Sequence, residues 1–156
     1  MNTTNASAEQ RLKELAIRLP RPSTPPGTYR DAVQAGNLLF LSGTLPVEEG
    51  VPKFLGRIGG ELSVEDGRRA TRLAALNALA AAREHLGSLE RVTRMVRLTV
   101  SLATTSASTR ASRIQRQSPL ATVFGADRTS TRVVYGAASL PVGVCVVVEL
   151  ILEVSM

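Results

Sequence analysis

The side chains that most often carry acid–base, nucleophilic or metal chemistry are scarce in this sequence of 156 residues. It has one histidine, His85, and one cysteine, Cys145, so it has neither a histidine pair nor an internal disulfide. His85 falls in the charged last turn of an expected helix, where a cation suits the helix dipole, and we interpret it as structural. The sequence thus shows neither a metal cluster nor the histidine pair that RNA cleavage would use.

Most of the charge comes from arginine. Nineteen basic residues face 13 acidic ones, for a net charge of +6 and a sequence pI of about 10.7, and only Lys13 and Lys53 are lysines. Such a pI permits nucleic-acid binding. The arginines form no block, however, and the aromatic residues on which single strands stack make up only 3% of the chain, so we do not expect nucleic acid as a partner. Arg110, Arg113 and Arg116 recur every third residue, which fits a solvated helix face better than a ligand-binding one.

The length suits one ordinary domain. Hydrophobic residues make up 44% of the chain, and with few aromatics the core must be built from Ala, Val and Leu. No apolar run approaches the roughly 18 residues that a membrane span requires. The N-terminus lacks the apolar segment of a signal peptide, so we expect a cytoplasmic protein.

The N-terminal part predicts a helix, a connector and a hairpin. Residues 7–19 form an amphipathic pattern with a Ser7–Gln10 capping box and one stripe of Leu12, Leu15, Ala16 and Leu19. We treat residues 1–19 as a helical extension and residues 20–156 as the domain, which begins with a proline-rich connector. Two strand-like runs, 29–35 and 37–43, flank Gly36-Asn37 and predict a hairpin. The loop from 46 to 60 has a further strand-like stretch at 53–55.

The clearest helix runs from Ser63 to Gly87. Ser63 and Asp66 match a capping box, and Gly87 stands where a C-terminal cap belongs. Small residues on one side favour close packing on a sheet, and Asn77 among them is expected to be a satisfied core amide. The apolar side reads Ala70, Leu73, Ala74, Asn77, Ala78 and Ala81.

The C-terminal half predicts a strand at 95–103, a helix at 119–125 and two strands at 131–141 and 142–154. The last run has one wholly apolar face, Val142, Val144, Val146, Val148, Leu150, Leu152 and Val154. Its other face is mixed and would leave Cys145, Val147 and Ile151 partly wet in a lone sheet. The order of elements predicts an α+β fold, a mixed sheet backed by helices.

Three segments in the right order resemble the RidA (YjgF-like) family. PPGTYRDAVQAGNLLFLSGTLP resembles its N-terminal hairpin, the stretch from GRIGGELSVEDG to MVRLTV its central helix and next strand, and RVVYGAASLP its arginine-to-Leu-Pro signature. The similarity covers residues 20 to 155. It implies a chorismate-mutase-like fold, a homotrimer with ligand clefts between subunits, and hydrolysis of enamines and imines to 2-oxo acids and ammonia without a metal or organic cofactor.

The resemblance also assigns site residues. Arg132 would grip a substrate carboxylate through its planar guanidinium, while Tyr29, Ser42 and Gly43 would line the cleft and the backbone of Val134 would contact the ligand. Without the resemblance, Arg132 is a surface salt-bridge residue and Tyr29 a packing residue. Ser42-Gly43 is then ordinary turn chemistry.

The sequence departs from the family where the chemistry occurs. Counted from the Leu-Pro landmark, the position of the catalytic glutamate is Val147, and valine cannot activate water. Glu149 lies on the same strand face, about 6.6 Å along the strand, and is the candidate carboxylate to substitute for it. Ile114 stands where typical members carry an asparagine that reaches the cleft.

Three functions remain open from the sequence. The first is a RidA-like protein that acts weakly on small imines, enamines or oxo acids, with Arg132 and Glu149 as its catalytic candidates. The second is a non-catalytic binder or a biosynthetic accessory protein that steers an imine. The third is a ribonuclease-like activity, which the histidine count does not favour.

Overall fold

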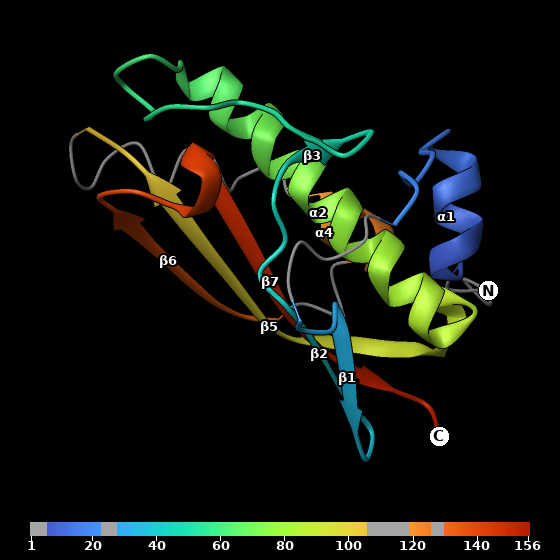
Figure 1. Cartoon of the computed structure of the whole chain (residues 1–156). Coiled ribbons are helices and arrows are strands. Elements are labelled where there is room, and N and C mark those ends of the chain that lie inside the picture. The colour runs from blue at the N-terminus through green and yellow to red at the C-terminus, as the bar shows by residue number, and fades with distance from the viewer. Residues whose placement is uncertain (1–5, 23–27, 106–118, 126–129) are drawn as a thin grey trace.

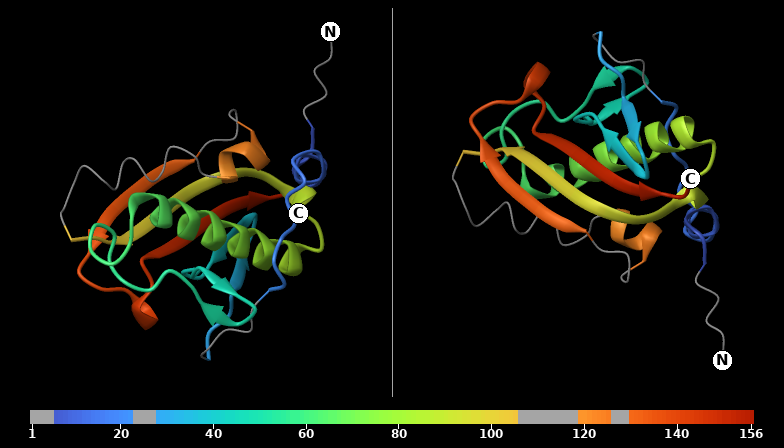
Figure 2. Two further views of the ribbon diagram at one scale, coloured as in Figure 1. Left: turned by 90° about the horizontal axis from the view of Figure 1, so that it is seen from above. Right: turned by 90° about the horizontal axis from the view of Figure 1, so that it is seen from below.

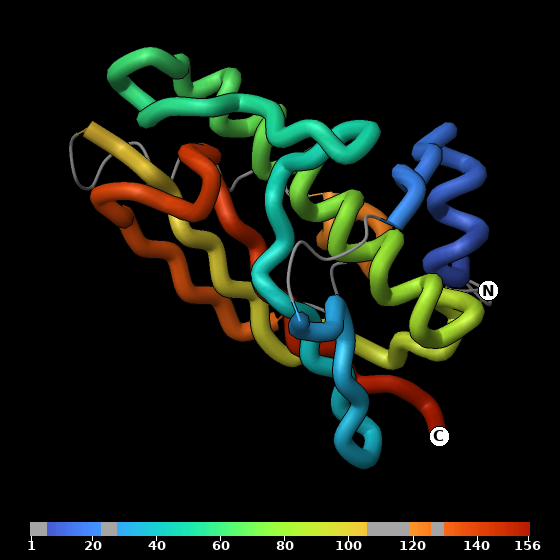
Figure 3. The backbone as a smooth tube through the Cα atoms, viewed as in Figure 1, coloured from blue at the N-terminus to red at the C-terminus, as the bar shows by residue number. Residues whose placement is uncertain are grey.

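The computed structural model describes residues 6–22, 28–105, 119–125 and 130–156, and Figures 1 and 3 follow the chain through them. The helices and strands alternate in the predicted order, with one extra hairpin. In chain order they are α1 (Ala8–Glu14), β1 (Ala32–Ala35), β2 (Leu38–Leu41), β3 (Val47–Glu48), β4 (Val51–Pro52), α2 (Val64–Leu86), η1 (Leu89–Arg91), β5 (Val92–Ala103), α4 (Pro119–Phe124), β6 (Thr131–Ala137), η4 (Pro141–Gly143) and β7 (Val146–Val154).

Five strands form one mixed sheet in the order β1-β2-β7-β5-β6. All neighbours are antiparallel except β5 and β6, which run parallel. A parallel pair needs a crossover connection, and α4 lies within the one between β5 and β6. The fold is therefore the predicted α+β sheet backed by helices.

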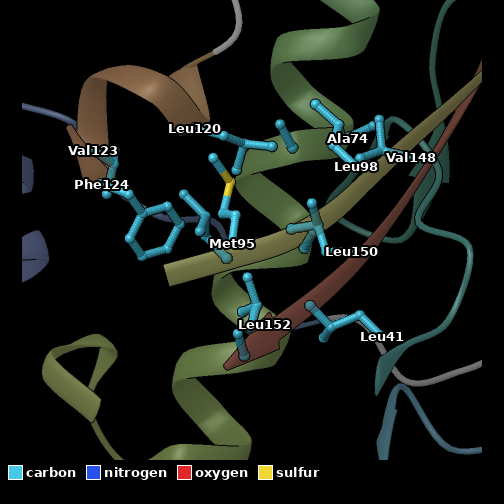
Figure 4. Close-up of a cluster of buried hydrophobic side chains, with 14 of the residues drawn as sticks. Leu41, Ala74, Met95, Leu98, Leu120, Val123, Phe124, Val148, Leu150 and Leu152 are labelled. Atoms are coloured by element: carbon cyan, nitrogen blue, oxygen red, sulfur yellow. The ribbon is translucent and has the colours of Figure 1, made fainter. Parts of the chain in front are cut away.

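Helix α2 covers one face of the sheet (Figures 1 and 2). Its buried positions are mostly alanines, which let the helix axis approach the strands closely, and Ala74 packs over Leu98 and Val148 (Figure 4). The buried stripe lies beside the predicted one, because Leu73 and Ala81 are only half-buried while Thr71, Ala75 and Leu79 are buried. Both helix ends match the sequence, with a complete Ser63–Asp66 capping box and a left-handed Gly87 at φ 81°.

Asn77 has the predicted satisfied amide. Its Nδ2 donates to the backbone carbonyls of Leu45 and Val47 at 3.0 and 2.8 Å. These bonds tie the segment after β2 to the helix. The same segment forms the β3–β4 hairpin around Glu49-Gly50, so the strand expected at 53–55 is wrong; only Leu55 makes an isolated bridge, to Val144.

Helix α1 is shorter than the predicted 7–19 helix. Ser7 caps it as expected by accepting from the Gln10 amide at 3.2 Å. The helix stops at Glu14 because Ala16 takes a positive φ of 52°, so Leu15 turns outward and is 45% exposed. Ala8 and Leu12 alone join the core, and Glu9 fixes the helix to the molecule through an ion pair with Arg83 at 3.0 Å.

The last strand begins later than the alternation predicted. Val142 lies in the η4 turn at φ 50° and is 63% exposed, whereas Cys145 is fully buried. The alternation from Val146 to Val154 is as expected, with every even-numbered residue buried against α2. No helix among the described residues covers the face of the sheet opposite α2. The right view of Figure 2 shows the molecule from that side.

We predict that Cys145 resists thiol reagents in the folded protein. Burial raises the pKa of its thiol to about 11, so the reactive thiolate is scarce at pH 8 and the sulfur is out of reach. Ellman's reagent should therefore react slowly in native buffer and fast in guanidinium chloride, which serves as the control. Complete labelling within the mixing time of the native sample would contradict the buried position.

Candidate functional site

The end of β2 is tied to the segment that precedes β1. The Ser42 amide donates to the Asp31 carbonyl at 2.8 Å, and the Ser42 hydroxyl donates to the Arg30 carbonyl at 2.7 Å. These two bonds hold Tyr29 in the segment beside Ser42. Tyr29 lies in a bend and not at the start of a strand, and it is 49% exposed.

Asp31 in this segment has a carboxyl with a raised pKa. Burial is the main cause, and the nearby carboxylate of Glu84 on α2 adds to it. The raised pKa means that the charged form of Asp31 is disfavoured in the folded protein. Asp31 contributes its backbone carbonyl to Ser42, so its role here is to position the end of β2.

Gly43 lies directly against β7. Thr44 and Val148 exchange two backbone hydrogen bonds, of 2.7 and 3.0 Å, and these fix the register at this point. A Cβ on Gly43 would lie 2.9 Å from Val147 Cγ1 and 3.8 Å from Glu149 Cγ. The side chains of Val147 and Glu149 therefore flank Gly43 on the sheet face opposite α2.

The polarity of this corner follows from these two side chains. Val147 is half-buried and apolar, and Glu149 is exposed. Glu149 pairs across the strands with Thr99, one row away from Val147. The Val147 side chain, which is nearest to Gly43, thus cannot accept a proton, and the Glu149 carboxylate is exposed to solvent.

Within one chain, Arg132 lies far from Gly43 and Val147. It pairs with Leu98, whose side chain is in the core under α2, so Arg132 leaves the edge strand β6 on the helix side of the sheet and is exposed. Val134, two residues on, is on that same side and packs against the core. Val147 is on the other face of the sheet. It lies two strands away from Arg132, which is about 9.6 Å across the sheet. Along β7 it is three residues from Leu150, which shares a row with Leu98, and this adds about 10 Å.

The structure therefore divides the predicted site residues into two groups. Tyr29, Ser42, Gly43 and Glu149 come together at the end of β2, while Arg132 and Val134 are at the far edge of the sheet. One chain by itself does not bring both groups to one ligand. Ile114 and the three regularly spaced arginines, Arg110, Arg113 and Arg116, lie outside the described residues.

The sequence alone did not identify Ser101 and Tyr135 as residues of this face. Ser101 pairs directly with Val147 on one side and with Tyr135 on the other, so the three side chains form one row across the sheet. The alternation of the 95–103 strand carried the signal, because Ser101 is a polar residue out of phase with the core residues Val100 and Leu102. It was not recognised since strand pairing cannot be derived from one sequence.

Within the described residues no three His, Cys, Asp or Glu side chains are grouped as a metal site would require. None of the described helices is long and apolar enough to cross a membrane. The site is thus a corner of a mixed α+β sheet with hydroxyl, glycine and carboxylate groups on its open face and an arginine at its edge.

Comparison with known proteins places this architecture in a family. The family model described as YjgF/chorismate mutase-like, putative endoribonuclease matches residues 9–154, and the chain belongs to this family. The curated protein TCP17 of Trypanosoma cruzi is 31% identical over 147 residues, which cover 92% of each chain.

Solved structures agree with that assignment. The chain is similar to Atu1372 of Agrobacterium tumefaciens, a protein of unknown function, at 32% identity and TM-score 0.84, with 97% of this chain and 94% of that one covered. A putative endoribonuclease of Shewanella oneidensis gives 26% identity and TM-score 0.83 over 95% and 99% of the two chains. Escherichia coli TdcF with bound serine shares the fold, at 22% identity and TM-score 0.57 over 87% and 94%.

We predict that Gly43→Ala destabilises the protein through Val147. The added methyl group would lie 2.9 Å from Val147 Cγ1, and overpacking of this kind costs about 1–3 kcal/mol. Denaturant unfolding should show the loss in Gly43→Ala and its partial reversal in Gly43→Ala/Val147→Ala. A Gly43→Ala variant as stable as the wild type would show that the two strands are not in this register.

Proposed function

We propose that the protein binds a small carboxylate carrying an imine, enamine or 2-oxo group in sites shared between copies of the chain, and that it hydrolyses imines close to the uncatalysed rate. The proposal rests on the close approach of Gly43 to Val147. The resemblance assigns Gly43 to the family's cleft and Val147 to its water-activating position, which is apolar in this chain. The separation of Arg132 from this corner supports a site completed by a second copy.

The open face of the sheet supports assembly. Val33, Phe40 and Tyr135 are 52%, 41% and 49% exposed there, and Val147 and Ile151 are only half-buried. Exposed apolar surface of this kind marks an interaction site in soluble proteins. Covering it with two further copies around a threefold axis gives a closed homotrimer, the arrangement that the resemblance implies.

Arg132 is suited to hold the carboxylate of the ligand. Its planar guanidinium can donate two parallel hydrogen bonds to a carboxylate, and its exposure on the edge strand leaves it accessible to a neighbouring copy. The E. coli protein TdcF is described with bound serine, a small amino acid that carries such a carboxylate. The ligand class is therefore a small carboxylic acid.

The chemistry beyond binding is limited by Val147. General acid–base assistance contributes about 10²- to 10⁴-fold to a rate, and a valine supplies none of it. Glu149 is the alternative base, but its exposed carboxylate lies one row from the Val147 position.

The same residues fit a non-catalytic binder or an accessory protein that steers an imine, which is the second candidate function. One similar structure is described as a putative endoribonuclease, so RNA is a further ligand to test for binding.

We predict that Arg132→Ala abolishes most 2-oxo acid binding. Charge-assisted hydrogen bonds contribute about 1.5–3 kcal/mol each, so pyruvate affinity measured by calorimetry should fall at least about tenfold. Arg132→Lys should recover part of the loss, because it restores the charge but not the two parallel bonds. Light scattering should give three times 16.6 kDa for each protein.

Arg72→Ala is the matched control, since Arg72 is an exposed arginine on α2. Its affinity should equal that of the wild type. Unchanged affinity in Arg132→Ala would make that arginine merely structural. A stable wild-type monomer at micromolar concentration would contradict the shared site.

We predict that wild-type imine hydrolysis is weak and that Val147→Glu raises it, because the substitution places a carboxylate beside Gly43. A dehydratase that generates 2-aminoacrylate, coupled to detection of pyruvate, measures both proteins. Val147→Gln, which has the shape without the charge, should stay inactive. If Glu149 has taken over the role, the wild type will already be active and Glu149→Gln will silence it. Strong wild-type activity that survives Glu149→Gln would contradict the proposed mechanism.

A further inference from the structure

Four residues on four neighbouring segments form a row across the open face of the sheet. Gly43 adjoins Val147, Val147 pairs with Ser101, and Ser101 pairs with Tyr135. Directly opposed residues in a sheet have Cβ atoms about 4.5–5.5 Å apart. Ser101 is therefore the nearest polar side chain to Val147 within the row, on the strand away from Gly43.

The side chain of Ser101 is almost wholly covered, and its hydroxyl has no hydrogen-bond partner among the described residues. Ser101 is only 5% exposed, since the small side chain lies low between the larger Val147 and Tyr135. None of the described residues forms a hydrogen bond with this hydroxyl. By contrast, the buried hydroxyl of Thr71 donates to the Gly67 carbonyl at 2.8 Å. The Ser101 hydroxyl is left free to hydrogen-bond a ligand that reaches this face.

We infer that Ser101 is a specificity-determining residue, which hydrogen-bonds the neutral polar group of the ligand, an imine nitrogen or a carbonyl oxygen, beside Val147. The inference rests on the proposed function, because Arg132 of another copy would hold the carboxylate of the same ligand. Tyr135 lies on the far side of Ser101 in the row. The ligand class is then a small 2-oxo or 2-imino acid.

The chemistry of a hydroxyl explains the selectivity expected from this arrangement. Serine has one donor and two acceptor positions, so it can serve either a carbonyl oxygen or an imine N–H. It carries no charge to balance an ammonium group, which would be desolvated beside Val147. Among the described residues of this face, the charged groups outside the ion pairs are Glu149, exposed and one row away, and Arg97, exposed on β5. The protein should therefore prefer a 2-oxo acid to the 2-amino acid of equal length.

Calorimetry with 2-oxobutanoate and 2-aminobutanoate tests the inference on wild type and Ser101→Ala. The wild type should bind the oxo acid more tightly, and Ser101→Ala should weaken that binding about tenfold while leaving the amino acid unchanged. Thr99→Ala is the matched control, since Thr99 is a hydroxyl residue on the same strand and face, paired with Glu149. It should keep the wild-type affinity and preference.

Thermal unfolding of the ligand-free proteins gives a second readout. Because the Ser101 hydroxyl has no partner in the protein, Ser101→Ala should melt at or above the wild-type temperature. A Ser101→Ala protein that keeps both affinity and preference would overturn the role of Ser101 and leave the proposed function standing. If wild-type protein binds neither acid while remaining a folded trimer, the proposed function fails and this inference fails with it.

Discussion

The packing of α2 on β5 and β7 is the contact on which the rest of the structure depends. A stripe of alanines brings the helix close to the strands, and the even-numbered residues of β7 are buried beneath it. Because successive strand residues point to opposite faces, this contact also decides which residues face away from the helix. Val147, Glu149 and Ile151 are on the open face for that reason alone.

The open face is where the proposed assembly would cover the single chain. Its apolar residues are partly exposed, and the residues expected to share a ligand lie on opposite faces and at different edges of the sheet. Arg132 leaves the helix side of β6, while Gly43 meets Val147 on the other side. A site made from both groups needs the edge strand of one copy beside the β2 end of another, so the proposed binding depends on the proposed assembly.

The altered corner explains why the proposal emphasises binding over turnover. The bonds from Ser42 to the segment before β1 and the exchange between Thr44 and Val148 keep the corner in shape. The resemblance places Val147 where the family carries the carboxylate that would act on water, and Ile114 is the chain's second departure from the family. Next to Val147, Ser101 supplies a hydroxyl that can hold a neutral group but is no base at neutral pH.

The sequence by itself determined the elements and the family. Local signals such as the Ser63–Asp66 box, Gly87 and the Gly36-Asn37 turn act within a few residues, so they predicted α2 and the first hairpin correctly. Predictions failed where tertiary contacts override local pattern: Ala16 ends α1 before Leu19, Val142 turns outward, and no strand forms at 53–55.

Only the tertiary structure decided which side chains meet. Strand order and register arise from contacts between residues far apart in the chain, and one sequence does not encode them as a readable pattern. The row from Gly43 through Val147 and Ser101 to Tyr135 joins four segments separated by up to 104 positions, counted from 43 to 147. The sequence supplied Arg132 and Val147 as candidates, but the sheet placed them apart, because Arg132 lies on the helix side of an edge strand and Val147 on the open face of a central one.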